Sequence, residues 1–175
     1  MIIKVKTFKI FTNSVYENTK EEYFTFYTPE CASYIDSYFE FRTRNGEILT
    51  DDSYFIREQF DINDLEQIRK HGRQITQATL SNILRSLVVS TGHRQINHQF
   101  TGKKRTRVLL ANGFRKFWTT QVINARINPE IREMLLGHKI GLASSYFKPT
   151  EQEMLNEYLK AVDNLTINEE NWVRR

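Results

Sequence analysis

The stretch that most constrains the fold of this 175-residue chain is residues 110–147, because it carries the clearest helix signals. Apolar residues recur at helical spacing from about residue 108 to residue 125. Asn128, Pro129 and Glu130 then form a typical helix start, with proline at the first helical position. Gly137, directly after two leucines, predicts the end of this helix. Two consecutive helices are therefore expected here.

Similar signals place the remaining elements. Residues 4–27 alternate β-branched or aromatic residues with polar ones and predict a β-hairpin, with Lys20 at or near its turn. Thr28 and Pro29 predict the start of a helix that ends at Asn45-Gly46. Residues 75–90 predict a core helix with Thr76 as its N-cap, and Thr150 with Glu153 predicts a capping box for a last helix. The first of these helices is expected to bury an apolar stripe of Tyr34, Ile35, Tyr38, Phe39 and Phe41.

Together these elements predict an α+β, mainly α-helical fold in which a small N-terminal β-hairpin packs on a helical core. We expect one domain over residues 1–165, with the hairpin at 4–27, the helical core at 29–163 and a polar C-terminal tail at 166–175. The single cysteine, Cys31, cannot form an internal disulfide, and no Cys/His cluster has zinc-ligand spacing. No apolar run reaches the roughly 18 residues that a membrane helix needs. A cytoplasmic protein with no membrane partner is expected.

The positive charge is concentrated in one window. Residues 67–129 contain twelve Lys or Arg residues and no Asp or Glu, so all 21 acids lie outside it. Four or five such cations could form an ordinary solvated face, but twelve without acids repel one another unless a polyanion neutralises them. The window therefore predicts duplex DNA as a partner. Sequence-independent phosphate contacts are expected from Lys103, Lys104, Arg105, Arg107 and Lys116.

Four features follow one another in a definite order. They are Lys20 near the hairpin turn, Asn112-Gly-Phe-Arg115 at a helix start, Leu-Leu-Gly-His138, and Tyr146 in Ser-Tyr-Phe. This order resembles the catalytic domain of the tyrosine recombinases, the phage-integrase family, and in particular its archaeal-type members. The resemblance extends from the hairpin to about residue 164, and its most specific part is the Leu-Leu-Gly-His segment.

The resemblance implies site-specific DNA recombination and integration through a 3′-phosphotyrosine intermediate, without a metal or another cofactor. Arg115 would stabilise the phosphorane, Lys20 would protonate the leaving 5′-oxygen, and His138 would be the histidine of the glycine-histidine box. Preorganised cations suit this chemistry because negative charge builds on the non-bridging phosphate oxygens. Other recombinase protomers on DNA are the implied partners, in a nucleoid-associated protein.

The chain departs from the family pattern at three places. Asn112 stands where the family has a histidine, and an amide cannot carry positive charge or move a proton. The nucleophile position falls on Phe147, so Tyr146 lies one residue early, which is a rotation of about 100° if the segment is helical. The first catalytic arginine precedes the hairpin in the family, whereas Arg94, in a similar local motif, follows it.

These departures predict a partial catalytic domain whose activity is impaired as a lone chain. A companion integrase fragment that supplies the missing arginine is a further expected partner. Two alternatives stay open. Tyr146 and Phe147 could be an aromatic pair that packs the last helix, and the chain could be a non-catalytic remnant that binds DNA or contacts another protomer through that helix. We also expect Arg115, Phe117, Trp118 and Met134 to lie at or near the core.

Overall fold

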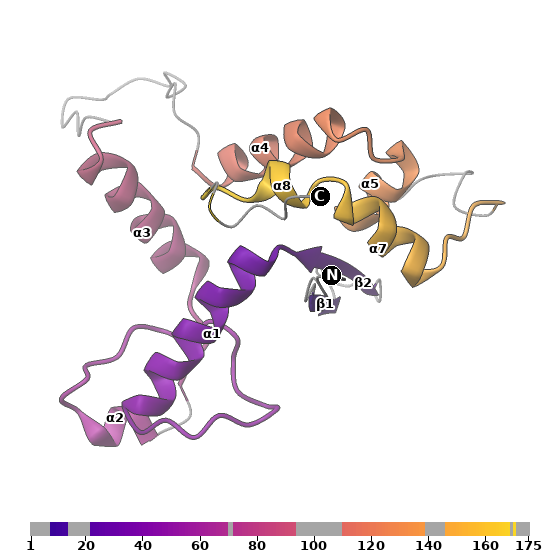
Figure 1. Ribbon diagram of the computed structural model, residues 1–175. Helices are drawn as coiled ribbons and strands as arrows, with labels where there is room; N and C mark the ends of the chain where they lie inside the picture. Colours follow the sequence, from indigo (N-terminus) through magenta and orange to yellow (C-terminus); the bar gives the residue numbers. More distant parts are fainter. Residues whose placement is uncertain are drawn as a thin grey trace. The chain divides into compact units, whose positions relative to one another are not determined.

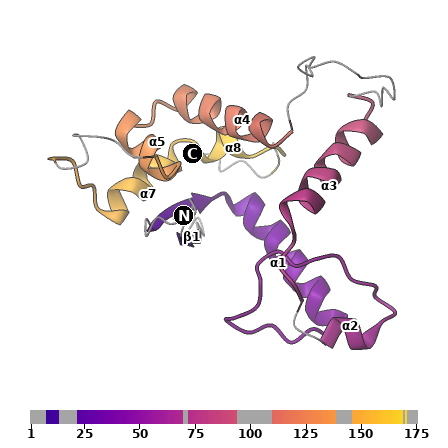
Figure 2. The same ribbon diagram turned by 180° about the vertical axis from the view of Figure 1, so that it is seen from behind.

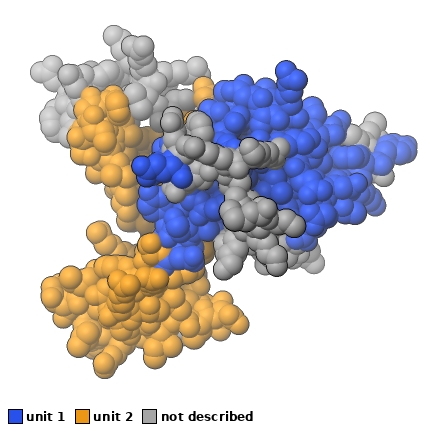
Figure 3. Space-filling view, viewed as in Figure 1, with its two compact units in different colours: residues 1–36, 118–175 blue, residues 37–117 orange. Residues whose placement is uncertain are grey.

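The computed structural model describes residues 8–13, 22–69, 72–93, 110–138, 146–168 and 170, with backbone only for residues 8–13, 22 and 23. In this part of the chain the structure is mainly helical, with one antiparallel pair of strands (Figure 1). The predicted α-rich class with an N-terminal hairpin is therefore confirmed. The chain divides into two compact units. Unit 1 comprises Met1–Asp36 and Trp118–Arg175, and unit 2 comprises Ser37–Phe117 (Figure 3).

The helices and strands have the following bounds. The strands are β1 (Phe8–Asn13) and β2 (Glu22–Tyr27), paired from Phe8↔Tyr27 to Asn13↔Glu22. The helices are α1 (Pro29–Arg44), α2 (Leu65–Arg69), α3 (Gln77–Ser90), α4 (Ala111–Asn124), α5 (Pro129–Leu135), α7 (Glu151–Leu159) and α8 (Val162–Leu165). Helix α1 begins in unit 1 and ends in unit 2, whereas α4 begins in unit 2 and ends in unit 1.

The predicted N-caps are confirmed by their hydrogen bonds. The Thr28 hydroxyl accepts from the Cys31 N–H at 3.2 Å, and the Thr76 hydroxyl accepts from the Thr79 N–H at 3.1 Å. Thr150 and Glu153 form the predicted capping box at the start of α7. Each bond satisfies a backbone donor that the first turn of a helix leaves without a partner. Local sequence therefore determines where these helices begin.

Unit 1 has an apolar core between the hairpin and the C-terminal helices. Its buried members are Phe26, Val122, Ile127, Ile131, Leu135, Met154, Tyr158, Ala161 and Val162. Phe26 extends from β2 to the Tyr158 ring on α7, with ring centroids 5.5 Å apart. Figures 1 and 2 both show α5, α7 and the hairpin side by side. Trp118 and Met134 pack against this core as expected.

The predicted polar tail is anchored where it begins. The backbone N–H groups of Ile167 and Asn168 donate to the two carboxylate oxygens of Glu30, at 2.8 and 2.9 Å. Thr166 is buried beside them. Glu30 lies in the first turn of α1, where the helix dipole also favours a carboxylate. The end of the described chain is thus fixed to the start of α1.

Unit 2 has a polar centre. Among its described residues Ile68 is the one buried apolar side chain, and the other buried side chains are Arg42, Glu47 and Arg57. Two expectations for this unit are wrong. Within the described chain no residue of α3 is buried, so it is not a core helix. In the predicted α1 stripe, Tyr34 (a unit 1 residue) and Phe41 are exposed, because the buried side of α1 continues from Tyr38 and Phe39 to Arg42.

Candidate functional site

Five of the residues predicted for the site belong to the described chain. Asn112, Arg115 and Lys116 lie on α4 in unit 2, and His138 and Tyr146 lie in unit 1. The hairpin lysine Lys20 lies outside the described residues, as do Lys103, Lys104, Arg105, Arg107 and the alternative arginine Arg94. The five described residues therefore form two separate groups, one in each unit.

The first group is a polar face near the start of α4. Residues three and four apart on a helix are neighbours, so Arg115 and Lys116 both lie on the same side of α4 as Asn112. All three side chains are exposed. The expectation that Arg115 lies close to the core is therefore wrong, and Phe117 is also exposed by 44%. Because the sequence of α4 contains no acidic residue, this face presents two cations and an amide to solvent.

The second group begins at the end of α5, where Gly137 adopts a left-handed conformation with φ of 72°. The Gly137 N–H donates to the Met134 carbonyl at 3.0 Å, and the His138 N–H donates to the Glu133 carbonyl at 2.9 Å. These two bonds are those of a Schellman motif, the usual glycine-dependent helix end. The Leu-Leu-Gly-His segment therefore ends a helix as predicted, and it fixes the backbone of His138.

The His138 side chain is held by a residue that the sequence did not single out. Its Nδ1 donates to Glu133 Oε2 at 2.7 Å, and Glu133 also pairs with Arg132 at 2.8 Å. The His138 hydrogen bond, together with Arg132, lowers the pKa of Glu133 although partial burial opposes this. With Nδ1–H bonded to a carboxylate, Nε2 is the ring atom that can act on a ligand. A glutamate five residues before the histidine was the available sequence signal.

The side chains of Tyr146 and Phe147 differ in their exposure to solvent. Tyr146 is 90% exposed, whereas Phe147 is half-buried and packs against the core of unit 1. The interpretation that both form an aromatic pair against the last helix is therefore right for Phe147 and wrong for Tyr146. The position that the family pattern assigns to the nucleophile is occupied by a packing residue, and the hydroxyl one residue earlier is available to a ligand.

The cations of the acid-free window lie at the surface. Six of the twelve are described, and all six are exposed: Arg69, Arg73, Arg85, Arg115, Lys116 and Arg126. Arg73 has an acidic neighbour in Glu58, whose Oε1 is 3.9 Å from Arg73 Nε, a long and solvent-exposed contact. By contrast, Arg42 and Arg57, which precede the window, are buried against Glu47. The described part of the window thus contributes charge to the surface and not to the interior.

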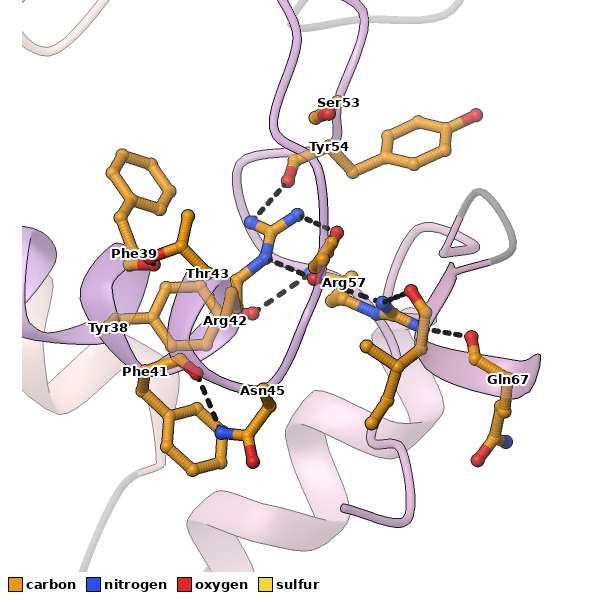
Figure 4. A network of polar contacts seen from close by, with 12 residues as sticks. Tyr38, Phe39, Phe41, Arg42, Thr43, Asn45, Ser53, Tyr54, Arg57 and Gln67 are labelled. Atoms are coloured by element: carbon orange, nitrogen blue, oxygen red, sulfur yellow. Dashed lines mark hydrogen bonds and ion pairs between the residues drawn. The ribbon is translucent and has the colours of Figure 1, made fainter. Parts of the chain in front are cut away.

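The Arg42–Glu47–Arg57 network is the second feature that the sequence did not predict (Figure 4). Arg42 donates twice to the Glu47 carboxylate, at 2.9 and 2.6 Å, and Arg57 Nη1 lies 3.0 Å from Glu47 Oε2. Arg42 also donates to the backbone carbonyls of Tyr54 and Phe55. The hydrogen bonds from Arg42 lower the pKa of Glu47, and those from Arg57 add to this, although desolvation acts in the opposite direction.

Arg57 closes the network on its other side. Its guanidinium lies 4.5 Å from the Phe60 ring centroid and donates to the carbonyls of Gln67 and Ile68, at the negative end of α2. Gly72 passes so close that an added Cβ would lie 2.4 Å from Arg57 Nε. Within the described chain Arg57 Nε itself has no hydrogen-bond partner. The arrangement buries two cations around one carboxylate, and the charged groups pair with one another, so we interpret it as structural.

Searches of protein-family models, of curated proteins and of solved structures find no significant match to this chain. Within the described residues, no group of three or more His, Cys, Asp or Glu side chains is placed to hold a metal ion. None of the described helices is long and apolar enough to cross a membrane. What the site can do must therefore be inferred from its own residues.

Proposed function

We propose that this chain binds duplex DNA through its acid-free window. The observation that carries the proposal is the exposure of every described cation in a 63-residue stretch that lacks acids. Contact between exposed cations and a phosphate backbone is favourable, because it releases the counterions that are condensed on the DNA. Sequence-independent affinity that depends steeply on salt is the expected property.

Filter binding of labelled duplex DNA at increasing salt tests this proposal. If the six described cations each contact a phosphate, log K against log salt should have a slope of about −5. The double variant Arg115→Gln, Lys116→Gln should make that slope shallower by about 2. Arg44→Gln is a matched control, because Arg44 is an exposed arginine outside the window that pairs with Glu40 at 2.9 Å. Failure of the wild-type chain to retain duplex DNA at low salt would refute the proposal.

We further propose that the bound DNA is the substrate of tyrosine-recombinase chemistry, with Tyr146 as nucleophile. The Tyr146 hydroxyl gives its proton to Nε2 of His138 as its oxygen attacks the phosphorus, the bond from phosphorus to the 5′-oxygen breaks, and a proton from Lys20 neutralises that oxygen. Arg115 stabilises the charge on the non-bridging oxygens. This proposal is supported by the order of these residues along the chain, by the exposed Tyr146 and by the fixed His138 ring.

A suicide substrate with a nick near the cleavage site tests the chemistry by trapping the phosphotyrosine adduct. The lone chain should give little adduct, because Asn112 stands at the family's histidine position and cannot supply positive charge. Tyr146→Phe should remove what remains, whereas Phe147→Tyr should add none, since residue 147 packs against the core. Adding an upstream integrase fragment should increase trapping. Abundant adduct from the lone chain would contradict the impaired activity.

The alternative of a module that contacts another protomer through its last helix has less support. Helix α7 buries Met154 and Tyr158, and Leu155 and Leu159 are partly buried against the same core. Its apolar side is therefore already occupied within unit 1. DNA binding remains the function that the described residues support best.

A further inference from the structure

Arg126, the second residue after the end of α4, has a backbone conformation that is unfavourable for any residue other than glycine. Its φ is +56°, and it is the only described residue other than glycine with a positive φ. The remaining positive values in the described chain belong to Gly46, Gly92 and Gly137. In the left-handed region the Cβ of an L-residue crowds the backbone, which is why glycine usually occupies such positions.

Hydrogen bonds at the end of α4 require this conformation. The Arg126 N–H donates to the Ile123 carbonyl at 2.9 Å, and the Ile127 N–H donates to the Val122 carbonyl at 3.2 Å. This is again a Schellman motif, and Val122 and Ile127 supply the apolar contact that often accompanies it, since both are buried in the core of unit 1. Arg126, at the glycine position of this motif, must therefore adopt the left-handed conformation whatever its side chain.

The Arg126 side chain makes no contact that would offset this strain within the described chain. It is exposed, and none of the described residues forms a hydrogen bond or an ion pair with its guanidinium. A structural explanation exists, because a cation near the C-terminal end of a helix interacts favourably with the helix dipole. That interaction is weak for an exposed side chain, and it does not need a strained position. Strain that persists without a structural benefit points to function.

We infer that Arg126 is a phosphate-contacting residue of the DNA interface, an inference that rests on the proposed DNA binding. Arg126 belongs to the acid-free window, and its guanidinium can donate two parallel hydrogen bonds to a phosphate. The buried Val122 and Ile127 on either side of the turn fix the backbone from which it projects. An exposed arginine on a fixed backbone loses less backbone entropy on binding a phosphate than one on a flexible loop.

Four variants test the inference by filter binding and thermal unfolding. Arg126→Gly relieves the strain and removes the charge, so its Tm should rise by about 2–4 °C while DNA affinity falls about fivefold. Its salt slope should become shallower by about 0.9, the value for one phosphate contact. Arg126→Ala should lose the same affinity without the gain in Tm. Arg126→Lys should keep most of the salt slope.

Lys160→Ala, the fourth variant, is the matched control, because Lys160 is an exposed cation of the same unit that lies outside the window and pairs with Glu157. It should change DNA affinity less than twofold. An Arg126→Gly protein that binds DNA as the wild type does, with an unchanged salt slope, would overturn the inference, whatever its Tm. Absence of DNA binding by the wild-type chain would instead overturn the proposed function itself. The two failures are thus distinguishable in one experiment.

Discussion

Replacing Glu47 by glutamine should lower the free energy of unfolding by about 3–5 kcal/mol, because the buried guanidiniums of Arg42 and Arg57 then lose their shared counter-charge. Both arginines are almost fully buried, with side-chain exposures of 1% each, and Glu47 is their only acidic partner among the described residues. A neutral amide keeps the shape of the site but cannot offset the desolvation of two cations. Denaturant unfolding followed by circular dichroism measures the loss.

Glu40→Gln provides the comparison within the same unit. Glu40 pairs with Arg44 at a similar distance, 2.9 Å, but both side chains are more than half exposed. Such a pair contributes at most about 0.5 kcal/mol. Equal effects of Glu40→Gln and Glu47→Gln would show that burial of the network does not decide its importance.

The Glu47 carboxylate also determines how this contribution depends on pH. The folded-state pKa of Glu47 lies below its ordinary value of 4.5, so the folded protein holds the proton less tightly than the unfolded chain does. The contribution is therefore fully present above about pH 4.5 and is lost as pH falls through the lower folded-state pKa. Glu47→Gln should remove this part of the acid dependence, while Glu40→Gln should leave it unchanged.

The sequence predicted those features that depend on neighbouring residues. Thr28 with Pro29, and Thr150 with Glu153, act within four residues of each other, so their pattern identifies the helix starts. Gly137 likewise predicts the end of α5. The Arg42–Glu47–Arg57 network could not be predicted in this way, because Arg57 reaches Glu47 through a loop whose path depends on the rest of unit 2. The one sequence pattern that pointed to this network is the position of Arg42, which continues the apolar stripe of α1.

Exposure was the least predictable property of the candidate site. The apolar spacing of α3 shows that it has an apolar side, but not whether that side finds a partner, and none of its residues is buried in the described chain. Arg115 was placed near the core because aromatic residues flank it, yet the flanking Phe114 and Phe117 are themselves exposed. Tyr146 and Phe147 are neighbours in sequence with opposite surroundings. Which of the two faces the core depends on packing that a local pattern does not specify.

The packing of the hairpin on the helical core of unit 1 depends on Phe26. Its ring is buried, with centroids 5.6 Å from Phe24 on the same strand and 5.5 Å from Tyr158 on α7. Phe26→Ala should therefore cost about 3–5 kcal/mol, as expected for a buried phenylalanine whose cavity cannot collapse. Phe26→Leu keeps most of the apolar volume and should cost less than about 1.5 kcal/mol.

The consequence of Phe26→Ala for function follows from the role proposed for the hairpin. If Lys20 acts on DNA from the hairpin, a hairpin detached from α7 should lose strand cleavage before DNA binding, because the described cations of the window lie on other elements. Hydrogen exchange should then show faster exchange at the β2 amides, while the filter-binding salt slope stays unchanged. A Phe26→Ala protein with protected β2 amides would contradict this role of Phe26. Equal losses of DNA binding and of adduct formation would instead indicate that the whole of unit 1 has unfolded.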